Sequence, residues 1–168
     1  MSCYYFDSSA LAKKYINEAG SDWVLNITAT VSRNQLITSL ITSVEVVAAI
    51  AKGGRMGALS DDDMHEAILA FKKELHQNVY STLAVTQQIV DKAMNLAEEH
   101  GLRAYDSVQL SSALELQSER ELEGLSPVDF VSCDLKLNAA AESEGLNVIN
   151  PQTLHKPDLP EPKRQNDS

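Results

Sequence analysis

Short runs of strand-forming residues alternate along this chain with longer segments of helical periodicity, and this alternation most constrains the fold. The five runs lie at residues 3–6, 35–42, 80–85, 129–133 and 146–149, and a helical segment follows each of the first four. Such a pattern is typical of parallel strands joined by right-handed helical crossovers. We therefore expect an α/β fold, a three-layer α/β/α sandwich around a central, mostly parallel sheet.

Helical segments with recognisable starts and ends fill most of the remaining chain. We expect helices over residues 8–15, 21–31, 43–50, 61–75, 87–100, 103–124 and 135–144. The glycine-rich loop Gly53–Gly57 is expected to end the third of these helices. Ser60 is expected to cap the fourth, whose first turn carries Asp61, Asp62 and Asp63. Because the helix dipole favours acids there, we interpret this triplet as a solvated helix start rather than a metal cluster.

The length of 168 residues suits one domain with a proper core, which we expect over residues 1–151. The chain from residue 150 onward holds four of the five prolines and little apolar clustering, so residues 152–168 are predicted to be a flexible, Pro-rich tail. No stretch reaches the apolar length of a membrane span, and no signal-peptide pattern is present, so we expect a cytoplasmic protein. Cys3 and Cys133 fall in expected strands and are interpreted as buried free thiols.

The chain is acidic, with a net charge of −10 and a pI of about 4.8. This charge argues against a protein that holds nucleic acid through the bulk electrostatics of its surface. It remains compatible with a nucleic-acid enzyme whose acids surround a metal ion, and with a protein that binds a basic partner.

Four acids occupy comparable places relative to the expected strands and helices. Asp7 and Asp134 each follow a strand directly. Glu45 lies one helical turn beyond the second strand, and Asp106 lies near the start of the long helix. The carboxyl ends of parallel strands share one edge of a sheet, so three of these acids should converge there, and the long helix should supply the fourth.

Each acid taken alone also fits a purely structural role. Asp7 and Asp134 suit the N-caps of the helices that follow them. Thr42 and Glu45 match a capping box. Asp106 suits the first turn of a helix, where the dipole favours an acid. It is the hardest to explain in this way, because it shares a helix face with two leucines.

Carboxylates gathered at one place repel one another, and a fold keeps them together mainly to bind a cation. An all-oxygen site suits Mg²⁺ or Mn²⁺, held by a few carboxylates with water in the other positions. Such an ion activates a water molecule and neutralises the charge that develops on a phosphodiester. The four acids together therefore favour metal-dependent hydrolysis of a phosphate ester.

The segments around the four acids resemble the motifs of the PIN domain family, and most of all those of its VapC-type ribonuclease toxins. The segment YYFDSSALAKKY resembles the first motif, TSLITSVEVVAAIAK the second and GLRAYDSVQLSSAL the third. The fourth motif and the closing strand are resembled by DFVSCDLKLNAAAESEGLNVINP. The resemblance runs from residue 3 to about residue 151. One departure is Ser107, which stands where the family most often has Ala.

This resemblance implies an α/β/α sandwich and Mg²⁺- or Mn²⁺-dependent cleavage of single-stranded RNA that leaves a 5′-phosphate. It implies that the catalytic, metal-binding acids are Asp7, Glu45, Asp106 and Asp134. Ser132 resembles a small hydroxyl residue often found two positions before the fourth acid, and Ser8 is a further secondary candidate. The resemblance also implies a homodimer and a cognate antitoxin, which wraps the toxin and blocks its acidic pocket with basic residues.

An acidic enzyme would have to hold its RNA through local bases. Candidates by position, each of which also fits a solvated surface role, are Lys13, Lys14, Lys52, Arg55 and Arg103. An antitoxin would find a docking surface on the helices on either side of the glycine-rich loop. The apolar positions there that either line this surface or belong to the core are Val46, Ile50 and Phe71.

Two other functions stay open from the sequence. A non-catalytic PIN-like module would use the acids as helix caps and serve to bind proteins. A metal-dependent phosphatase on a similar sheet would use Asp7 as a nucleophile, but Ser9 stands where that chemistry usually has a second acid. Binding of a divalent ion would separate the enzymes from the module, and activity on RNA would separate the two enzymes. The four histidines fall outside the acidic motifs, and we expect no catalytic role for them.

Overall fold

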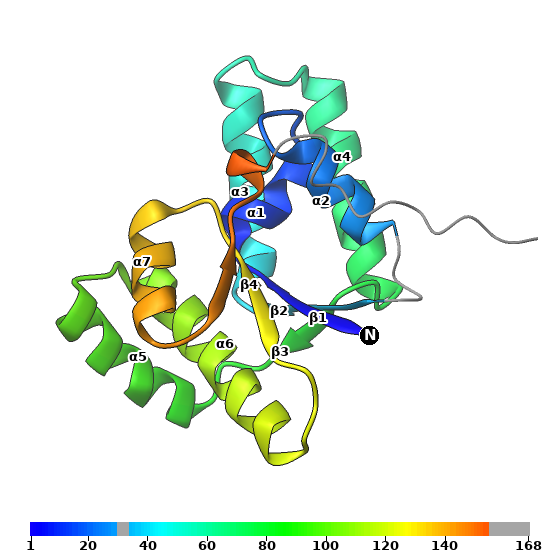
Figure 1. The fold of residues 1–168 in the computed structure, drawn as a ribbon. Helices are drawn as coiled ribbons and strands as arrows, with labels where there is room; N and C mark the ends of the chain where they lie inside the picture. Colours follow the sequence, from blue (N-terminus) through cyan, green and yellow to red (C-terminus); the bar gives the residue numbers. More distant parts are fainter. Residues whose placement is uncertain (30–33, 155–168) are drawn as a thin grey trace, which may run out of the picture.

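Parallel strands form the middle layer of the fold, and helices cover both of its faces (Figure 1). The structure is a computed structural model that describes residues 1–29 and 34–154. Its strands are β1 (Ser2–Phe6), β2 (Asn34–Ser39), β3 (Ser81–Leu83), β4 (Val128–Val131) and β5 (Asn147–Ile149). They lie in the order β3-β2-β1-β4-β5, and every neighbouring pair in this part of the chain is parallel. The predicted three-layer α/β/α sandwich is confirmed.

Helices follow the strands in the order that the sequence predicts. The α-helices are α1 (Ser8–Leu11), α2 (Ser21–Thr28), α3 (Thr42–Arg55), α4 (Asp61–His76), α5 (Gln87–His100), α6 (Ala104–Leu122) and α7 (Leu135–Ser143). Two short 3-10 helices are η1 (Ala12–Lys14) and η2 (Pro151–Thr153). Ser60 caps α4 and the three following acids are exposed, which confirms the solvated helix start. Val31, predicted to lie in the second helix, and His155 fall outside the described residues.

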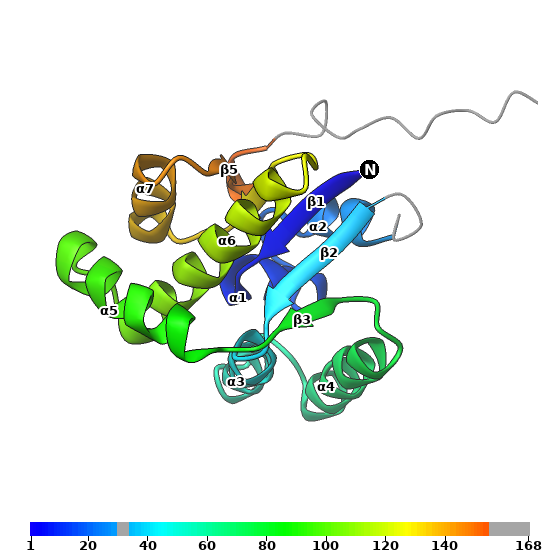
Figure 2. The ribbon, with the colours of Figure 1, turned by 90° about the horizontal axis from the view of Figure 1, so that it is seen from below.

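Successive side chains of a strand point to opposite faces of the sheet, so the hydrophobic core is divided between these two faces. Cys3 and Tyr5 of β1 pack with the residues of α5, α6 and α7, whereas Phe6 packs with those of α1 to α4. Figure 2 shows α5, α6 and α7 grouped on one side of the sheet. The sequence assigned three residues of α3 and α4 either to the core or to a docking surface, namely Val46, Ile50 and Phe71. All three are fully buried, which confirms the core alternative.

The glycine-rich loop begins later than the sequence predicts. Helix α3 continues through Gly53 and Gly54 to Arg55, and the chain turns at Gly57, which has a φ of +75°. A Cβ atom at Gly54 would overlap the side chain of Met64 on α4, so glycine there allows the two helices to approach closely. The prediction that residues 53–57 end the helix is therefore wrong for the first three positions.

The end of the described chain packs back onto the domain. Pro151 of η2 is buried, and Leu154 packs against the core formed by α1 to α4. The predicted flexible tail otherwise concerns residues 155–168, which the structure does not describe. Both cysteines are free and Cys3 is buried, but Cys133 is only partly buried and lies just after β4 instead of inside it. Among the described helices, none combines the length and the hydrophobicity that a membrane crossing requires.

Gly20 provides a test of how η2 closes the domain. Gly20 has a φ of +92°, and a Cβ atom there would lie 2.8 Å from the carbonyl carbon of Pro151. We expect Gly20→Ala to lower the free energy of unfolding by about 2–4 kcal/mol, since the left-handed backbone and the overlap with main-chain atoms both oppose a side chain. Urea unfolding monitored by circular dichroism measures this change.

Gly57→Ala is the matched control, because Gly57 also has a positive φ but no atom within 4 Å of the added Cβ. This control should cost only about 1–2 kcal/mol. Equal losses in the two variants would contradict close packing of η2 against Gly20.

Candidate functional site

The candidate acids lie at the edge of the sheet where the parallel strands end. Asp7 directly follows β1, and Asp134 follows β4 after two intervening residues. Glu45 lies in the first turn of α3, which follows β2, and Asp106 lies in the first turn of α6. The backbone N–H of Asp7 donates to the carbonyl of Val131 at 3.1 Å, so the ends of the two central strands are fixed to each other.

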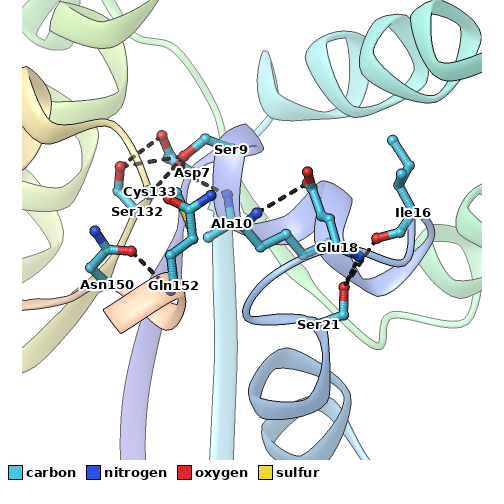
Figure 3. A network of polar contacts seen from close by, with 11 residues as sticks. Asp7, Ser9, Ala10, Ile16, Glu18, Ser21, Ser132, Cys133, Asn150 and Gln152 are labelled. Atoms are coloured by element: carbon cyan, nitrogen blue, oxygen red, sulfur yellow. Dashed lines mark hydrogen bonds and ion pairs between the residues drawn. The ribbon is translucent and has the colours of Figure 1, made fainter. Parts of the chain in front are cut away.

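Asp7 is enclosed, with only 3% of its surface exposed. Its Oδ1 accepts hydrogen bonds from the Ser9 hydroxyl at 2.8 Å and from the N–H of Ala10 at 3.1 Å (Figure 3). Its Oδ2 accepts one from the Ser132 hydroxyl at 3.1 Å. Asp7 therefore is the N-cap of α1, as its structural interpretation predicts. A carboxylate has about four acceptor positions, so this cap leaves capacity for a cation.

Burial controls the protonation of Asp7. It raises the pKa of this carboxyl to about 7, although the hydrogen bonds from Ser9, Ala10 and Ser132 oppose the shift. The negative charge of Glu45 raises the pKa further. A buried carboxyl with such a pKa is destabilised in its charged form, and a bound cation would reverse that effect.

Ser132 connects the first and the fourth acid. Its hydroxyl donates to Asp7 and accepts from the backbone N–H of Asp134 at 3.1 Å. Asp134 in turn accepts from the N–H of Leu137 at 2.8 Å and caps α7. The carbonyl of Ser132 accepts from the Asn138 side chain at 3.1 Å. The fully buried Ser132 hydroxyl thus links the Asp7 carboxylate to the main chain of Asp134.

Glu45 is held by Gln109 rather than by a capping box. Thr42 already lies inside α3, whose N-cap is Ile41, so the capping-box alternative is wrong. The Gln109 amide nitrogen donates to Glu45 Oε2 at 2.6 Å and to Thr42 Oγ1 at 2.7 Å. Its amide oxygen accepts from the Tyr5 hydroxyl at 2.8 Å. Because Gln109 is only 1% exposed, this network joins β1, α3 and α6 away from solvent.

Glu45 and Asp106 interact through their charges. Partial burial raises the pKa of Glu45, and the negative charge of Asp106 raises it further. The hydrogen bond from Gln109 and the nearby hydroxyl of Ser8 oppose this shift. Ser8, a secondary candidate from the sequence, therefore lies next to Glu45 and stabilises its ionised form.

Asp106 lies between a further acid and two bases. Its pKa is raised by partial burial and then by the charge of Asp134. Arg103 and Lys136 act in the opposite direction. These two cations do not fully offset the burial and the repulsion, so negative charge at Asp106 remains incompletely compensated.

The four acids form a row along the sheet edge. Glu45 raises the pKa of Asp7, Asp106 raises that of Glu45, and Asp134 raises that of Asp106. Each acid is therefore close enough to its neighbour to repel it. Donors that are all oxygen, with uncompensated negative charge, fit a hard divalent cation such as Mg²⁺ or Mn²⁺.

A more compact group of candidate ligands lies elsewhere in the described chain. Glu99, His100 and Glu144 each place one ligand atom within 4.8 Å of the others, a criterion that the row of acids does not meet. His100 Nε2 lies 2.7 Å from Glu144 Oε1, and this contact joins α5 to the end of α7. Among the described residues, no three of the four acids place ligand atoms as close together as Glu99, His100 and Glu144 do.

Two lysines that the sequence predicts to bind RNA instead contact acidic side chains of the protein. Lys13 is only 2% exposed, and its Nζ lies 3.0 Å from a carboxylate oxygen of Glu18. Lys14 donates to Glu74 at 2.8 Å and to the Tyr80 hydroxyl at 3.0 Å, which fixes η1 to α4. The prediction is therefore wrong for these two lysines. Exposed bases on α3, before α6 and on α7 are Lys52, Arg55, Arg103 and Lys136.

Ser9, Gln109 and Lys136 contribute to the site but were not singled out for it from the sequence. Gln109 is a polar residue one helical turn after Asp106, in a stretch that is otherwise apolar or small, and this position is the signal that identifies it. Ser9 enters the sequence argument only as the residue that stands where a phosphatase has a second acid. The electrostatic effect of Lys136 on Asp106 depends on how α7 packs beside α6, which the sequence does not specify.

The comparisons with known proteins agree with this geometry. The family model described as "PIN domain" matches residues 4–143. No curated protein matches the sequence.

Solved structures share the fold. PAE2754 from Pyrobaculum aerophilum aligns with a TM-score of 0.58 and 22% identity, over 90% of this chain and 92% of that one. VapBC2 from Rickettsia felis, solved bound to a DNA fragment from its promoter, aligns with a TM-score of 0.55 and 14% identity, over 88% and 98% of the two chains. At these identities the alignments establish a common fold.

The raised pKa of Asp7 predicts how stability depends on pH without divalent ions. The native state binds the Asp7 proton more tightly than the unfolded chain, so stability should fall as the pH rises from about 4 to about 7. Asp7→Asn removes this titration. Relative to the native chain, the variant should therefore gain stability across that range, on the order of a few kcal/mol. Urea unfolding in EDTA at several pH values measures the difference, and a difference independent of pH would contradict the buried, raised-pKa carboxyl.

The Gln109 network predicts coupling between two buried side chains. Gln109→Leu leaves the fully buried Tyr5 hydroxyl without its acceptor and should cost about 1–3 kcal/mol of unfolding free energy. Tyr5→Phe in the same chain should recover part of that loss, because neither partner is then left unsatisfied. A double-mutant cycle by urea unfolding gives the coupling, and strictly additive losses would show that the bond contributes nothing.

Proposed function

The chain belongs to the PIN domain family, and from this membership we propose that it is a divalent-metal-dependent endoribonuclease acting on single-stranded RNA. PIN domains are generally nucleases. The observation that carries the proposal is the row of four acids at the sheet edge, three of them with raised pKa values and each next to another acid. A protein gains little from such a row unless a cation occupies it.

In this proposal one or two Mg²⁺ or Mn²⁺ ions are held by Asp7, Glu45, Asp106 and Asp134. When bound, such an ion activates water and neutralises the charge that develops on the phosphodiester. The chain contributes the orientation of its carboxylates. Ser132 orients the Asp7 carboxylate and the main chain at Asp134, and Gln109 orients the Glu45 carboxylate.

The same contacts weaken the phosphatase alternative. A carboxylate nucleophile needs an accessible oxygen, whereas Asp7 is buried and both of its oxygens accept hydrogen bonds. Its enclosed position suits a ligand of an ion better than a group that attacks phosphorus.

Substrate binding in this proposal depends on a few bases near the row. Arg103 precedes α6 and Lys136 lies in the first turn of α7, and both act electrostatically on Asp106. They supply positive charge next to the acids, where a phosphate of the RNA would bind. Lys52 and Arg55 lie at the far end of α3 and would contact more distant nucleotides.

We further propose that this nuclease is the toxin of a toxin–antitoxin pair and forms a homodimer. Support comes from the resemblance of its motifs to those of VapC-type toxins and from the fold shared with VapBC2 of Rickettsia felis. The net charge of −10 suits a basic antitoxin segment. With the core positions of α3 and α4 buried, a partner on these helices would contact exposed apolar side chains such as Val44 and Leu69.

Cleavage of a mixed RNA substrate in Mn²⁺ tests the nuclease. We expect Asp106→Asn to lower the cleavage rate at least about 100-fold, because the substitution keeps the size of the side chain but removes the charge that a metal ion needs. Asp62→Asn is the matched control, since Asp62 is an exposed acid at the start of α4 and should leave the rate unchanged. Gel electrophoresis of labelled RNA measures both.

Equal cleavage by the native protein and the Asp106→Asn variant would assign the activity to another site or to a contaminant. An antitoxin-free native protein that neither cleaves RNA nor binds Mn²⁺ in calorimetry would overturn the proposal. It would favour the protein-binding module instead.

A further inference from the structure

A hollow of about 360 Å³ opens directly beside the row of acids. We call it the side pocket. Ser8 and Asp134 belong both to its lining and to the site, and Ile16, Ala49 and Glu18 also line it. Its volume lies within the range of small-molecule sites in proteins. A group bound there would therefore be adjacent to whatever the four acids hold.

One wall of the side pocket carries a carboxylate that a buried cation holds in place. Glu18 is 47% exposed, and one of its oxygens lies 3.0 Å from the Nζ of Lys13, which is only 2% exposed (Figure 3). The Glu18 backbone N–H donates to Ser21 Oγ at 3.0 Å, so the main chain is fixed as well. The ion pair restricts the rotamer of Glu18, yet each carboxylate oxygen keeps acceptor capacity toward the pocket.

The remaining lining suits a flat, partly apolar ring. Ile16 and Ala49 contribute apolar surface to the lining, and Gln152 of η2, which is exposed, contributes an amide. A nucleobase has this combination of apolar faces and a hydrogen-bonding edge. Proteins that read single-stranded RNA bind bases in this way, by contact with their faces and by hydrogen bonds to their edges.

Building on the proposed ribonuclease function, we propose that the side pocket binds one base of the RNA next to the cleaved bond. Glu18 accepts hydrogen bonds from the amino-bearing edge of that base. A carboxylate accepts but does not donate, so it selects bases with amino groups and disfavours uracil, whose single N3–H donor lies between two carbonyl oxygens that repel a carboxylate. Guanine fits best, since its neighbouring N–H and NH₂ groups match the two oxygens of a carboxylate. The side pocket thus determines the sequence at which the enzyme cuts.

The test maps cleavage sites in a random-sequence RNA pool with the full chain in Mn²⁺. The native protein should prefer an amino-bearing base, with guanine first, at one fixed position beside the cut. Glu18→Gln should lower that preference at least about fivefold, because the amide both donates and accepts and so tolerates uracil. The control is Glu66→Gln, the same chemical change at an exposed position on α4, which should leave the preference intact.

Ala49→Leu provides a second variant that leaves the ion pair untouched. The larger side chain narrows the side pocket and should raise KM or abolish the base preference. The affinity for Mn²⁺, measured by calorimetry, should stay the same because Ala49 is not one of the proposed metal ligands and its side chain makes no hydrogen bond. Thermal unfolding of both variants confirms that they fold.

Unchanged cleavage positions in folded Glu18→Gln and Ala49→Leu proteins, with active native enzyme, would overturn the base pocket and leave the nuclease proposal standing. A native preference for uracil at that position would also overturn it. A native protein that cuts no RNA in Mn²⁺ would instead remove the proposed function itself, and the base pocket with it.

Discussion

The burial of one carboxylate, that of Asp7, is the constraint on which the rest of the site depends. It stands at the end of the middle strand of the sheet, where water cannot reach it, and three donors from two segments only partly replace that water. Glu45 and Asp106 are also partly buried, and each has its pKa raised further by the negative charge of a neighbouring acid. The unfavourable electrostatics would be relieved by a cation, so the fold is less stable without the ligand that we propose than with it.

The helix-capping role of two of these acids is compatible with the ligand role that we propose for all four. Asp7 and Asp134 cap α1 and α7, which fixes each carboxylate to a helix start at the sheet edge. A capping side chain is already oriented by the backbone, so it needs little reorganisation to accept a cation as well. Glu45 obtains the same rigidity from a side chain, Gln109, because no cap is available to it. The structure confirms the caps at Asp7 and Asp134, and the ligand role of these acids stays a proposal.

The sequence was sufficient to predict the layers of the fold and the edge on which the acids gather, because alternating strands and helices leave few arrangements. It did not predict that α3 continues past Gly54, since that depends on contact with Met64 of a different helix. It misplaced Lys13 and Lys14 as surface bases, because their acidic partners come from contacts that local patterns do not encode. Gln109 and the side pocket were missed for the same reason: both arise only where segments distant in the sequence meet.

The separation in sequence between the residues that meet at the site has a consequence for when the site can form during synthesis. The contact between Asp7 and Ser132 spans 125 residues, and that between Tyr5 and Gln109 spans 104. A chain emerging from the ribosome cannot make either contact until nearly the whole domain has been translated. The row of acids is therefore incomplete on the nascent chain. A ribonuclease built in this way would begin to cut only near the end of translation, after most of its own message has been read.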